Sequence, residues 1–463
     1  MATIQFLGAT GTVTGSKYVL EVGGNRAMID CGLFQGFKEL RERNWEPLPV
    51  NPASIGWALV THAHIDHTGY LPRLVRDGFT GPIYATGASA DLMKIMLTDS
   101  GRLQEEDAEY ANRKGFSKHK PAVPLYTEQD ALRALKQVEP VAYGEDVRLS
   151  KFMTARFITS GHILGSSFIE FQVAEQGREP IKVVFSGDVG RYGEPILNDP
   201  AQVDEADYLL VESTYGDRLH DPADPKGKLA EIINETARRG GKIIIPAFAV
   251  GRTQLLVYYL RELEDEGRIP VLPVAVDSPM GAQATRIYSK HKEDHDLDMQ
   301  RIDNLNRNPL ATRNFSLVQG RGGSKALDAD TGPAIIISAS GMATGGRVLH
   351  HLARYLPDPA SAVIFVGYQG AGTRGRRLQD GEKEVKIHGQ MVEVNAHIES
   401  ISSLSAHADA AEILRWLGGF KRPPRTTFII HGEPDSAQAL RDKISEELGW
   451  NAVIPTYKQV VEL

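Results

Sequence analysis

The chain has 463 residues, a length that corresponds to two or three domains or to one large fold with an insertion. With 41% hydrophobic and 24% charged residues, it has the composition of a globular protein, which argues against disorder and a repeat array. The net charge of -7 argues neither for nor against a polyanionic partner, because the local sign of the charge decides binding.

The chain also lacks signals for a membrane or an oxidising compartment. No apolar run approaches the roughly 18 to 20 residues of a membrane span, and the N-terminus has no basic flank before an apolar stretch. The single cysteine, Cys31, excludes an internal disulfide framework and zinc sites of the finger type. We therefore expect a cytoplasmic protein with no membrane partner, in which any metal is held by histidine and carboxylate.

The N-terminal half predicts sheets flanked by helices. Short apolar or alternating runs at 3–9, 16–23, 26–32 and 54–62 lie between Gly, Asn and Pro signals and predict strands. Helical spacing follows from 86 to 107. Further strand-like runs then fill 147–214.

The second half predicts an inserted domain. From residue 216 helix-like and strand-like segments alternate, which implies a parallel sheet. Alternating strands return from Lys383 onward. We therefore predict three segments: 1–215 and 376–463 as the two parts of one domain, and 216–375 as a domain inserted between them.

The densest functional signal is the run Thr61-His62-Ala63-His64-Ile65-Asp66-His67, which follows an apolar strand. A tight turn at a strand end can direct His62 and His64 to one ion, and Asp66 and His67 to another. Zinc suits this mixture of imidazole and carboxylate.

Three further candidate ligands stand in the same context downstream. His162, Asp188 and His431 each end an apolar strand, so we expect them at the same sheet edge as the first cluster. A carboxylate such as Asp188 can bridge two cations held about 3.5 to 4 Å apart. Together with the first cluster, these residues predict two complete metal sites.

At this point a family resemblance becomes visible. The motifs THAHIDHTG, SGHILGS, FSGDVG, VESTYG, SLSAHAD and IIHGE resemble those of the metallo-β-lactamase superfamily, specifically its β-CASP nucleases. The chain most resembles the bacterial and archaeal relatives of the endonuclease subunit of the pre-mRNA cleavage and polyadenylation specificity factor. The resemblance implies an α/β (α+β) fold, namely an αββα sandwich with an inserted β-CASP domain whose mainly parallel sheet is flanked by helices.

The resemblance also implies a ligand set for two zinc ions per chain. One ion would be bound by His62, His64, His162 and Asp188. The other would be bound by Asp66, His67, Asp188 and His431.

Four residues are implied to act in catalysis. His407 would be the general acid, and Glu212 would raise its pKa by stabilising the imidazolium. Asp66 belongs to the catalytic set as well as to the ligands. Asp30 would hold a ligating imidazole in its orientation and tautomer, although a turn residue at this position is an ordinary alternative.

The expected reaction is hydrolysis of single-stranded RNA, which gives 5′-phosphate and 3′-hydroxyl ends. We expect endonuclease action, and 5′–3′ exonuclease action in addition is left open. RNA is preferred over DNA because family members that act on DNA typically have an aliphatic residue where this chain has His431. Predicted RNA contacts lie in the inserted domain and near the basic run 372–377: Arg252, Ser340, Arg347 and Arg374.

Three alternatives remain at this stage: a small-molecule hydrolase, a non-catalytic RNA-binding subunit and a DNA-repair nuclease. A homodimer is also left open.

Overall fold

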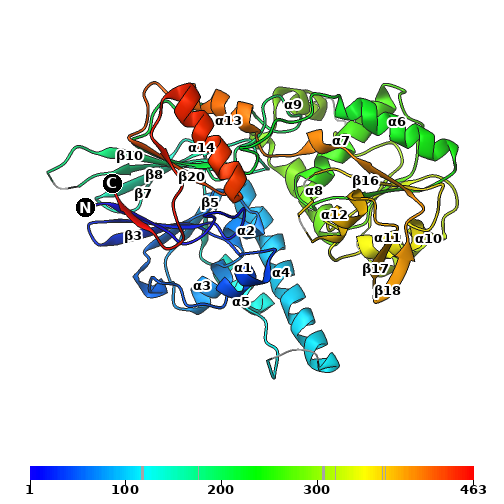
Figure 1. Cartoon of the computed structure of the whole chain (residues 1–463), viewed down its shortest axis with the longest axis horizontal. Helices are drawn as coiled ribbons and strands as arrows, with labels where there is room; N and C mark the ends of the chain where they lie inside the picture. Colours follow the sequence, from blue (N-terminus) through cyan, green and yellow to red (C-terminus); the bar gives the residue numbers. More distant parts are fainter. Residues whose placement is uncertain (116–118, 176, 305–307, 319, 368, 371) are drawn as a thin grey trace. The chain divides into compact units, whose positions relative to one another are not determined.

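The structure is a computed structural model that describes residues 1–115, 119–175, 177–304, 308–318, 320–367, 369–370 and 372–463. The chain forms two units (Figure 1): unit 1 comprises Met1–Leu219 and His407–Leu463, and unit 2 comprises His220–Ala406. Among the described residues, no helix combines the length and the apolar character needed to cross a membrane.

Unit 1 contains two seven-stranded sheets. The first has, in spatial order, β22 (Val460–Glu462), β1 (Thr3–Phe6), β2 (Lys17–Val22), β3 (Asn25–Cys31), β4 (Trp57–Leu59), β5 (Ile83–Thr86) and β6 (Val138–Val141). The second has β21 (Ala452–Val453), β20 (Thr426–Ile430), β11 (Tyr208–Glu212), β10 (Ile181–Phe185), β9 (Ser167–Val173), β8 (Met153–Thr159) and β7 (Asp146–Arg148). Each sheet is parallel in one half and antiparallel in the other.

The main core of unit 1 lies between these two sheets. Phe6 and Ile29 from the first sheet belong to one buried cluster with Phe171, Phe185 and Phe428 from the second. Burial of such side chains stabilises each by about 1.5 to 3 kcal/mol relative to exposure. Because strands alternate their side chains, the other face of each sheet needs its own cover.

Helices provide this cover. The helices of unit 1 are α1 (Lys38–Arg43), α2 (Ile65–Thr68), α3 (Leu71–Arg76), α4 (Gly87–Lys114), α5 (Glu128–Leu135), α13 (Ala410–Leu417) and α14 (Pro434–Leu448), with a 3-10 turn η1 (Pro52–Ser54). Trp416 of α13 and Leu440 of α14 are buried in a second cluster with Val184 and Ile429 of the second sheet. Helices α3, α4 and α5 pack together, and α4 also contacts β5 and β6 of the first sheet.

Unit 2 contains a six-stranded sheet in which every pair is parallel. Its order is β14 (Phe315–Leu317), β13 (Val274–Val276), β15 (Ile335–Ser338), β12 (Ile243–Pro246), β16 (Ala362–Phe365) and β19 (His397–Ser400). The helices are α6 (Pro225–Arg238), α7 (Arg252–Asp265), α8 (Pro279–Lys290), α9 (Leu297–Asn304), α10 (Arg321–Ala329), α11 (Val348–Tyr355) and α12 (Arg374–Gln379), with η2 (Lys292–Asp294) and η3 (Ser402–Leu404). A hairpin of β17 (Glu384–Ile387) and β18 (Gln390–Glu393) packs beside the sheet through Val385 and Ile387.

The predicted fold class is confirmed: two sheets flanked by helices, and a second unit with a parallel sheet. Two details differ from the sequence pattern. The helix expected at 86–107 begins one residue later and continues to Lys114. Residues 376–406 pack with unit 2, because β19 pairs in parallel with β16 of its sheet.

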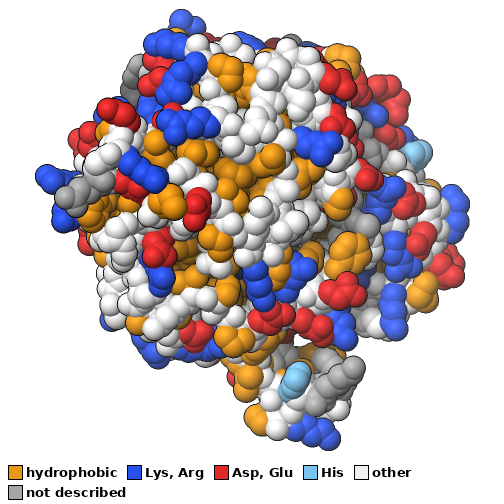
Figure 2. Space-filling view, turned by 60° about the vertical axis from the view of Figure 1, so that its left-hand side comes forward, with side chains coloured by type: hydrophobic (Ala, Val, Ile, Leu, Met, Phe, Trp, Pro, Cys, Tyr) orange, Lys and Arg blue, Asp and Glu red, His pale blue; other side chains and the backbone are white. Residues whose placement is uncertain are grey.

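The charges on one side of unit 1 are mixed. The side that lies at the left of Figure 1 carries acidic and basic side chains next to one another, with apolar patches between them (Figure 2). A polyanion is not favoured on such a surface, because its attraction to each cation is opposed by a nearby carboxylate.

Candidate metal centre

Four strand ends in unit 1 supply the candidate site. His62 and His64 follow β4, His162 follows β8, Asp188 follows β10, and His431 directly follows β20. Strands β8, β10 and β20 run in the same direction, so their carboxyl ends lie at one edge of the second sheet. The structure thus brings together at one place the candidate ligands that the sequence separates by up to 369 positions.

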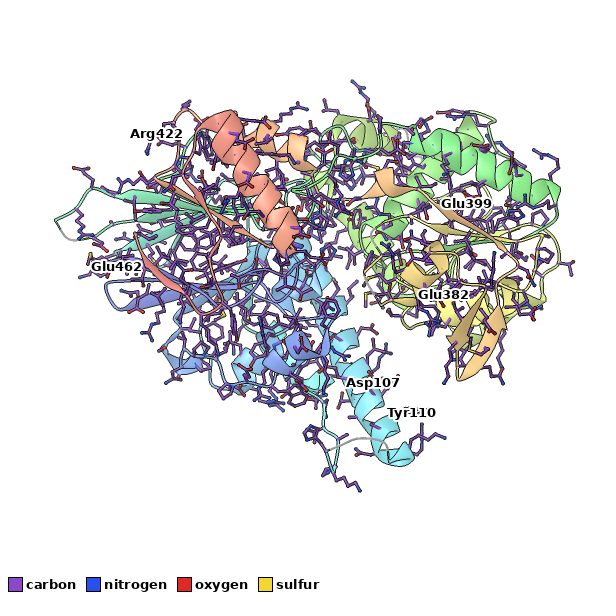
Figure 3. The ribbon with its side chains drawn as sticks, in the orientation of Figure 1. Asp107, Tyr110, Glu382, Glu399, Arg422 and Glu462 are labelled. Atoms are coloured by element: carbon purple, nitrogen blue, oxygen red, sulfur yellow. The ribbon has the colours of Figure 1, made fainter. Side chains whose placement is uncertain are left out.

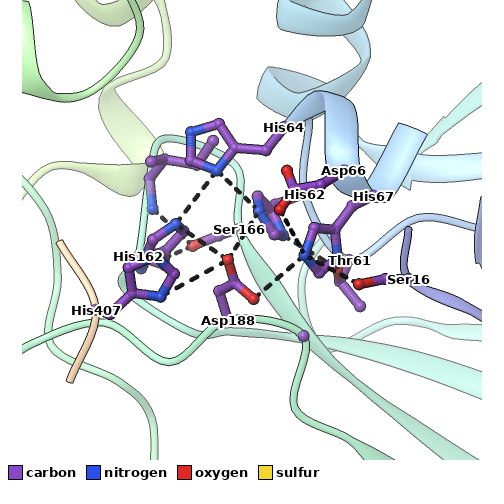
Figure 4. A network of polar contacts seen from close by, with 12 residues as sticks. Ser16, Thr61, His62, His64, Asp66, His67, His162, Ser166, Asp188 and His407 are labelled. Atoms are coloured by element: carbon purple, nitrogen blue, oxygen red, sulfur yellow. Dashed lines mark hydrogen bonds and ion pairs between the residues drawn. The ribbon is translucent and has the colours of Figure 1, made fainter. Parts of the chain in front are cut away.

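The first group of ligand atoms is centred on His64 (Figure 4). The Nδ1 atom of His64 lies 3.0 Å from Nε2 of His62 and 3.3 Å from Nε2 of His162. The Oδ2 atom of Asp188 lies 3.4 Å from Nε2 of His62 and 3.5 Å from Nε2 of His162. Four ligand atoms therefore converge on one point.

The second group of ligand atoms contains His67, His431 and Asp66. The Nε2 atoms of His67 and His431 lie 3.2 Å apart. The Oδ2 atom of Asp66 lies 3.9 Å from Nε2 of His67 and 3.4 Å from Nε2 of His431. The Oδ1 atom of Asp188 lies 3.3 Å from Nε2 of His67. The two oxygens of Asp188 thus face different groups, which is the geometry of a bridging carboxylate.

These separations fit metal ions with nitrogen and oxygen ligands. A tetrahedral zinc with ligands at about 2.0 to 2.1 Å keeps any two ligand atoms about 3.3 Å apart. The separations within the two groups range from 3.0 to 3.9 Å, around this value. In addition, Oδ1 of Asp188 is buried without a hydrogen-bond partner among the described residues, which is costly for an ionised carboxylate unless a cation pairs with it.

Asp30 holds one of the imidazoles from behind. Its Oδ2 atom accepts a hydrogen bond from Nδ1 of His67 at 2.7 Å, and its carboxylate also accepts from the backbone N–H and hydroxyl of Thr61. With its proton on Nδ1, His67 presents the lone pair of Nε2 to the second group. The hydroxyl of Thr61 also lies 3.1 Å from Nδ1 of His62, so this threonine contacts both ligand groups.

A bulge in β3 directs Asp30 to this position. Lys17 pairs with Cys31 and Tyr18 pairs with Ile29, so Asp30 is an extra residue on β3 with a φ of 53°. Bulges of this kind are frequent next to active sites, where they redirect one side chain.

His407 lies beside the first group and contacts Glu212. Its Nδ1 atom is 3.2 Å from Oε2 of Glu212 and 3.8 Å from Oδ2 of Asp188, and its ring centre lies 4.4 Å from that of His162, with the two rings tilted by 46°. Glu212 is fully buried and accepts hydrogen bonds from the backbone N–H of Val189 and the hydroxyl of Thr214. A carboxylate held in this way cannot turn away from the imidazole.

The electrostatics of the site separate the histidines. Burial keeps the pKa of His62 well below its usual range, so this imidazole is neutral and able to ligate. Burial also acts to lower the pKa of His67, but Asp188 and Asp30 raise it well above the usual value. A proton and a metal ion compete for the lone pair on Nε2 of His67. A metal ion bound there would therefore replace the positive charge that the proton supplies to the two carboxylates.

The nearest carboxylate to His407 is Glu212, which belongs to neither of the two groups described above. Burial acts to lower the pKa of His407, whereas Glu212 and Asp188 raise it to about 9. An imidazolium that persists at neutral pH and lies beside the ligand groups can donate a proton to a leaving group.

The four predicted RNA contacts all lie in unit 2. Arg347 donates to Asp277 at 2.6 Å, and Arg374 donates to the backbone carbonyls of Lys386 and Ala343. The hydroxyl of Ser340 accepts from the backbone N–H groups of residues 344 and 345. Arg252 is the first residue of α7 and is buried.

Sequence reasoning missed three residues that support the site. Thr61 and Thr214 lie inside the motifs that contain His62 and Glu212. Their closeness in sequence to these two residues is the feature that could have identified them. The third residue, Lys17, is a buried cation whose ammonium donates to the carbonyl of Gly32, two residues beyond Asp30.

The chain is similar to known proteins over most of its length. The model of the metallo-beta-lactamase superfamily matches residues 10–239, that of the Beta-Casp domain matches 253–378, and that of a Zn-dependent metallo-hydrolase RNA specificity domain matches 391–455. The chain is 37% identical over 434 residues to Ribonuclease TTHA0252 of Thermus thermophilus, which covers 94% of each protein. It is 31% identical over 453 residues to Transcription termination factor FttA of Methanocaldococcus jannaschii, which covers 95% of this chain and 68% of that protein.

A solved structure has a similar fold. The crystal structure of a protein of unknown function from Enterococcus faecalis aligns over 100% of both chains with a TM-score of 0.56. At 11% sequence identity, this likeness concerns the fold alone.

Proposed function

Because the chain belongs to the metallo-β-lactamase superfamily and, within it, to the β-CASP family, we propose that it is a ribonuclease that hydrolyses RNA phosphodiester bonds with two zinc ions. The observation that carries the proposal is the position of Asp188. Its two oxygens face two separate groups of imidazole and carboxylate ligands, and His407 stands next to one of them.

The proposed ligands follow from these distances. His62, His64, His162 and Asp188 hold the first ion. Asp66, His67, His431 and Asp188 hold the second. Zinc ions held by these residues would supply hydroxide at neutral pH and would neutralise the charge that develops on the phosphate oxygens.

The chain's own residues supply the remaining chemistry. Asp30 orients His67 and keeps its proton on Nδ1. Glu212 keeps His407 protonated, and His407 gives its proton to the leaving 3′-oxygen of the ribose, which is a poor leaving group without it. The products are then a 5′-phosphate and a 3′-hydroxyl.

Several observations favour RNA as the substrate over a small molecule. The matched relative from Thermus thermophilus is named a ribonuclease, and the model that matches residues 391–455 is described as an RNA specificity domain. His431 fills the position that is typically aliphatic in family members that act on DNA. We therefore assign single-stranded RNA to this site.

For unit 2 we propose that Arg252, Ser340, Arg347 and Arg374 support RNA binding. Arg347 and Arg374 are already engaged by acceptors within the protein, at Asp277 and at two backbone carbonyls. Their contribution is then to hold the loop of residues 339–347 in the shape against which RNA binds.

The test is cleavage of end-labelled single-stranded RNA, and of DNA of the same sequence, by wild type and by His407→Ala. Zinc content is measured on both samples. We expect the wild type to cut RNA with two zinc ions bound, and the variant to keep its metal but lose activity by about 10² to 10⁴-fold. The matched control is His397→Ala, an exposed histidine on β19 of unit 2.

The outcomes separate the alternatives. If the wild type holds two zinc ions but leaves RNA intact, the small-molecule hydrolase or the RNA-binding subunit takes the place of this proposal. Equal cleavage of DNA and RNA would instead favour the DNA-repair nuclease.

A further inference from the structure

The second half of helix α4 stands away from the two sheets of unit 1, as Figure 3 shows at Asp107 and Tyr110. This part of the helix has one covered side. Asn112 exchanges two hydrogen bonds of 2.8 and 2.7 Å with the backbone of Ala122, and Tyr126 donates to Ser100 at 2.7 Å. The segment from 119 to 128 therefore covers one side of the helix and leaves the opposite side to solvent.

The solvent side carries an ordered series of side chains. With about 100° of rotation per residue, six exposed residues fall within one face about 120° wide. We call them the α4 stripe: Leu103, Glu106, Asp107, Tyr110, Arg113 and Lys114. All six are exposed in the structure.

The α4 stripe has two features that are unusual for a solvated helix face. Leu103 and Tyr110, two turns apart, are 49% and 48% exposed. In the described part of the chain, none of the four charges of the stripe takes part in an ion pair, whereas Asp99 and Arg102 on the preceding turn pair with each other. The guanidinium of Arg113 instead lies 5.6 Å from the centre of the Tyr110 ring.

The order of these residues is self-complementary. Two acidic residues precede Tyr110 by three and four positions, and two basic residues follow it by three and four positions. When two such helices lie antiparallel about a two-fold axis at Tyr110, residue 106 of one faces residue 114 of the other, and 107 faces 113. Such an arrangement pairs every charge with an opposite charge, as an isologous interface requires.

We propose that the α4 stripe is a homodimerisation surface, on which a second copy of this chain lies antiparallel with Tyr110 at the two-fold axis. An RNA strand is disfavoured there, because Glu106 and Asp107 would repel its phosphates. The stripe runs for about 17 Å along the helix axis, so it buries much less than a standard interface of about 1,200 to 2,000 Å². The dimer is therefore weak, and its strength depends on charge and on salt.

Charge reversal with complementation tests the proposal. Sedimentation of the full chain is measured over a range of concentrations at about 0.02 M and about 0.5 M salt, where charge screening differs strongly. We expect dimer formation by the wild type at low salt, weakened about tenfold or more at high salt. Glu106→Lys/Asp107→Lys and Arg113→Glu/Lys114→Glu should each be monomeric alone and should form a heterodimer when mixed.

The mixing step separates loss of an interface from loss of structure. All four substitutions are at exposed positions, and a variant that fails to fold cannot be rescued by its partner. Cleavage of RNA by dilute enzyme is expected to stay unchanged, so the dimer and the nuclease function are tested separately. A wild type that remains monomeric at high concentration, or variants that do not complement each other, would overturn the proposal.

A crosslink tests the position of the axis. The chain's single cysteine, Cys31, is buried, so Tyr110→Cys introduces the one accessible thiol in the part of the chain that the structure describes. Mild oxidation should give a disulfide-linked dimer with Tyr110→Cys. The control Asn112→Cys, at an exposed position outside the α4 stripe, should give much less; equal crosslinking of both would refute the antiparallel arrangement.

Discussion

Replacement of Lys17 by methionine should change how the stability of unit 1 depends on pH. The Lys17 ammonium is buried, donates to the carbonyl of Gly32 and lies 4.5 and 4.8 Å from the ring centres of Phe34 and Tyr70. Burial lowers its pKa from 10.5 to about 8. Lys17→Met keeps the length of the side chain and removes the charge.

The size of the effect follows from the two pKa values of Lys17. The unfolded chain, with a pKa of 10.5, binds the proton more tightly than the folded chain does. Below about pH 8 the charge therefore costs the folded state about 3 kcal/mol, at about 1.36 kcal/mol per pKa unit. The cost is lost as the pH rises toward 10.5, so the wild type should gain about 2 kcal/mol relative to Lys17→Met between about pH 7.5 and 10.

Tryptophan fluorescence during urea unfolding provides the assay. All four tryptophans, Trp45, Trp57, Trp416 and Trp450, lie in unit 1, so the signal reports this unit alone. The variant also loses the hydrogen bond to Gly32 and the two ring contacts, which shifts its stability by a constant amount. A difference between wild type and variant that does not change with pH would refute the reasoning.

Three further changes test the metal centre. Asp188→Asn should reduce the bound zinc to at most one ion per chain, because neutralisation removes the shared ligand; two ions in the variant would contradict bridging. Glu212→Gln should move the alkaline limb of kcat/KM to lower pH by about one unit, since this carboxylate helps to raise the pKa of His407 to about 9. If the alkaline limb of the kcat/KM profile stays at the same pH in the variant, His407 is not the general acid. Asp30→Asn should weaken zinc binding about 10- to 100-fold in a chelator competition, because His67 loses the acceptor that holds its ring. Wild-type affinity would leave Asp30 with no role in positioning.

The candidate ligands were predictable because their signal is local. His162, Asp188 and His431 each follow an apolar strand, and the structure places all three at one sheet edge with the cluster of residues 62–67. The sequence also indicated the parallel sheet of unit 2, through its alternation of helix and strand.

Other features depend on which strands pair with one another, and the hydrophobic pattern of the sequence does not show the pairing of distant strands. A lysine at the start of an alternating strand reads as exposed, but the bulge opposite Lys17 shifts the register of β2 and β3, and Lys17 is buried. Similarly, strands of residues 384–400 read the same in either unit, and only the pairing of β19 with β16 assigns them to unit 2. The outward face of α4 became visible only once the segment 119–128 was seen to cover the opposite side.

The interrupted chain path of unit 1 has a consequence for its biosynthesis. Unit 2 is a continuous segment, whereas unit 1 needs β20 to pair with β11, β22 to pair with β1, and His431 to complete its groups of candidate ligands. Because a chain emerges from the ribosome N-terminus first, unit 2 has all its residues before unit 1 can close. A nascent chain that still lacks β20 therefore cannot assemble the candidate metal centre, so the groups of candidate ligands become complete only when synthesis is almost finished.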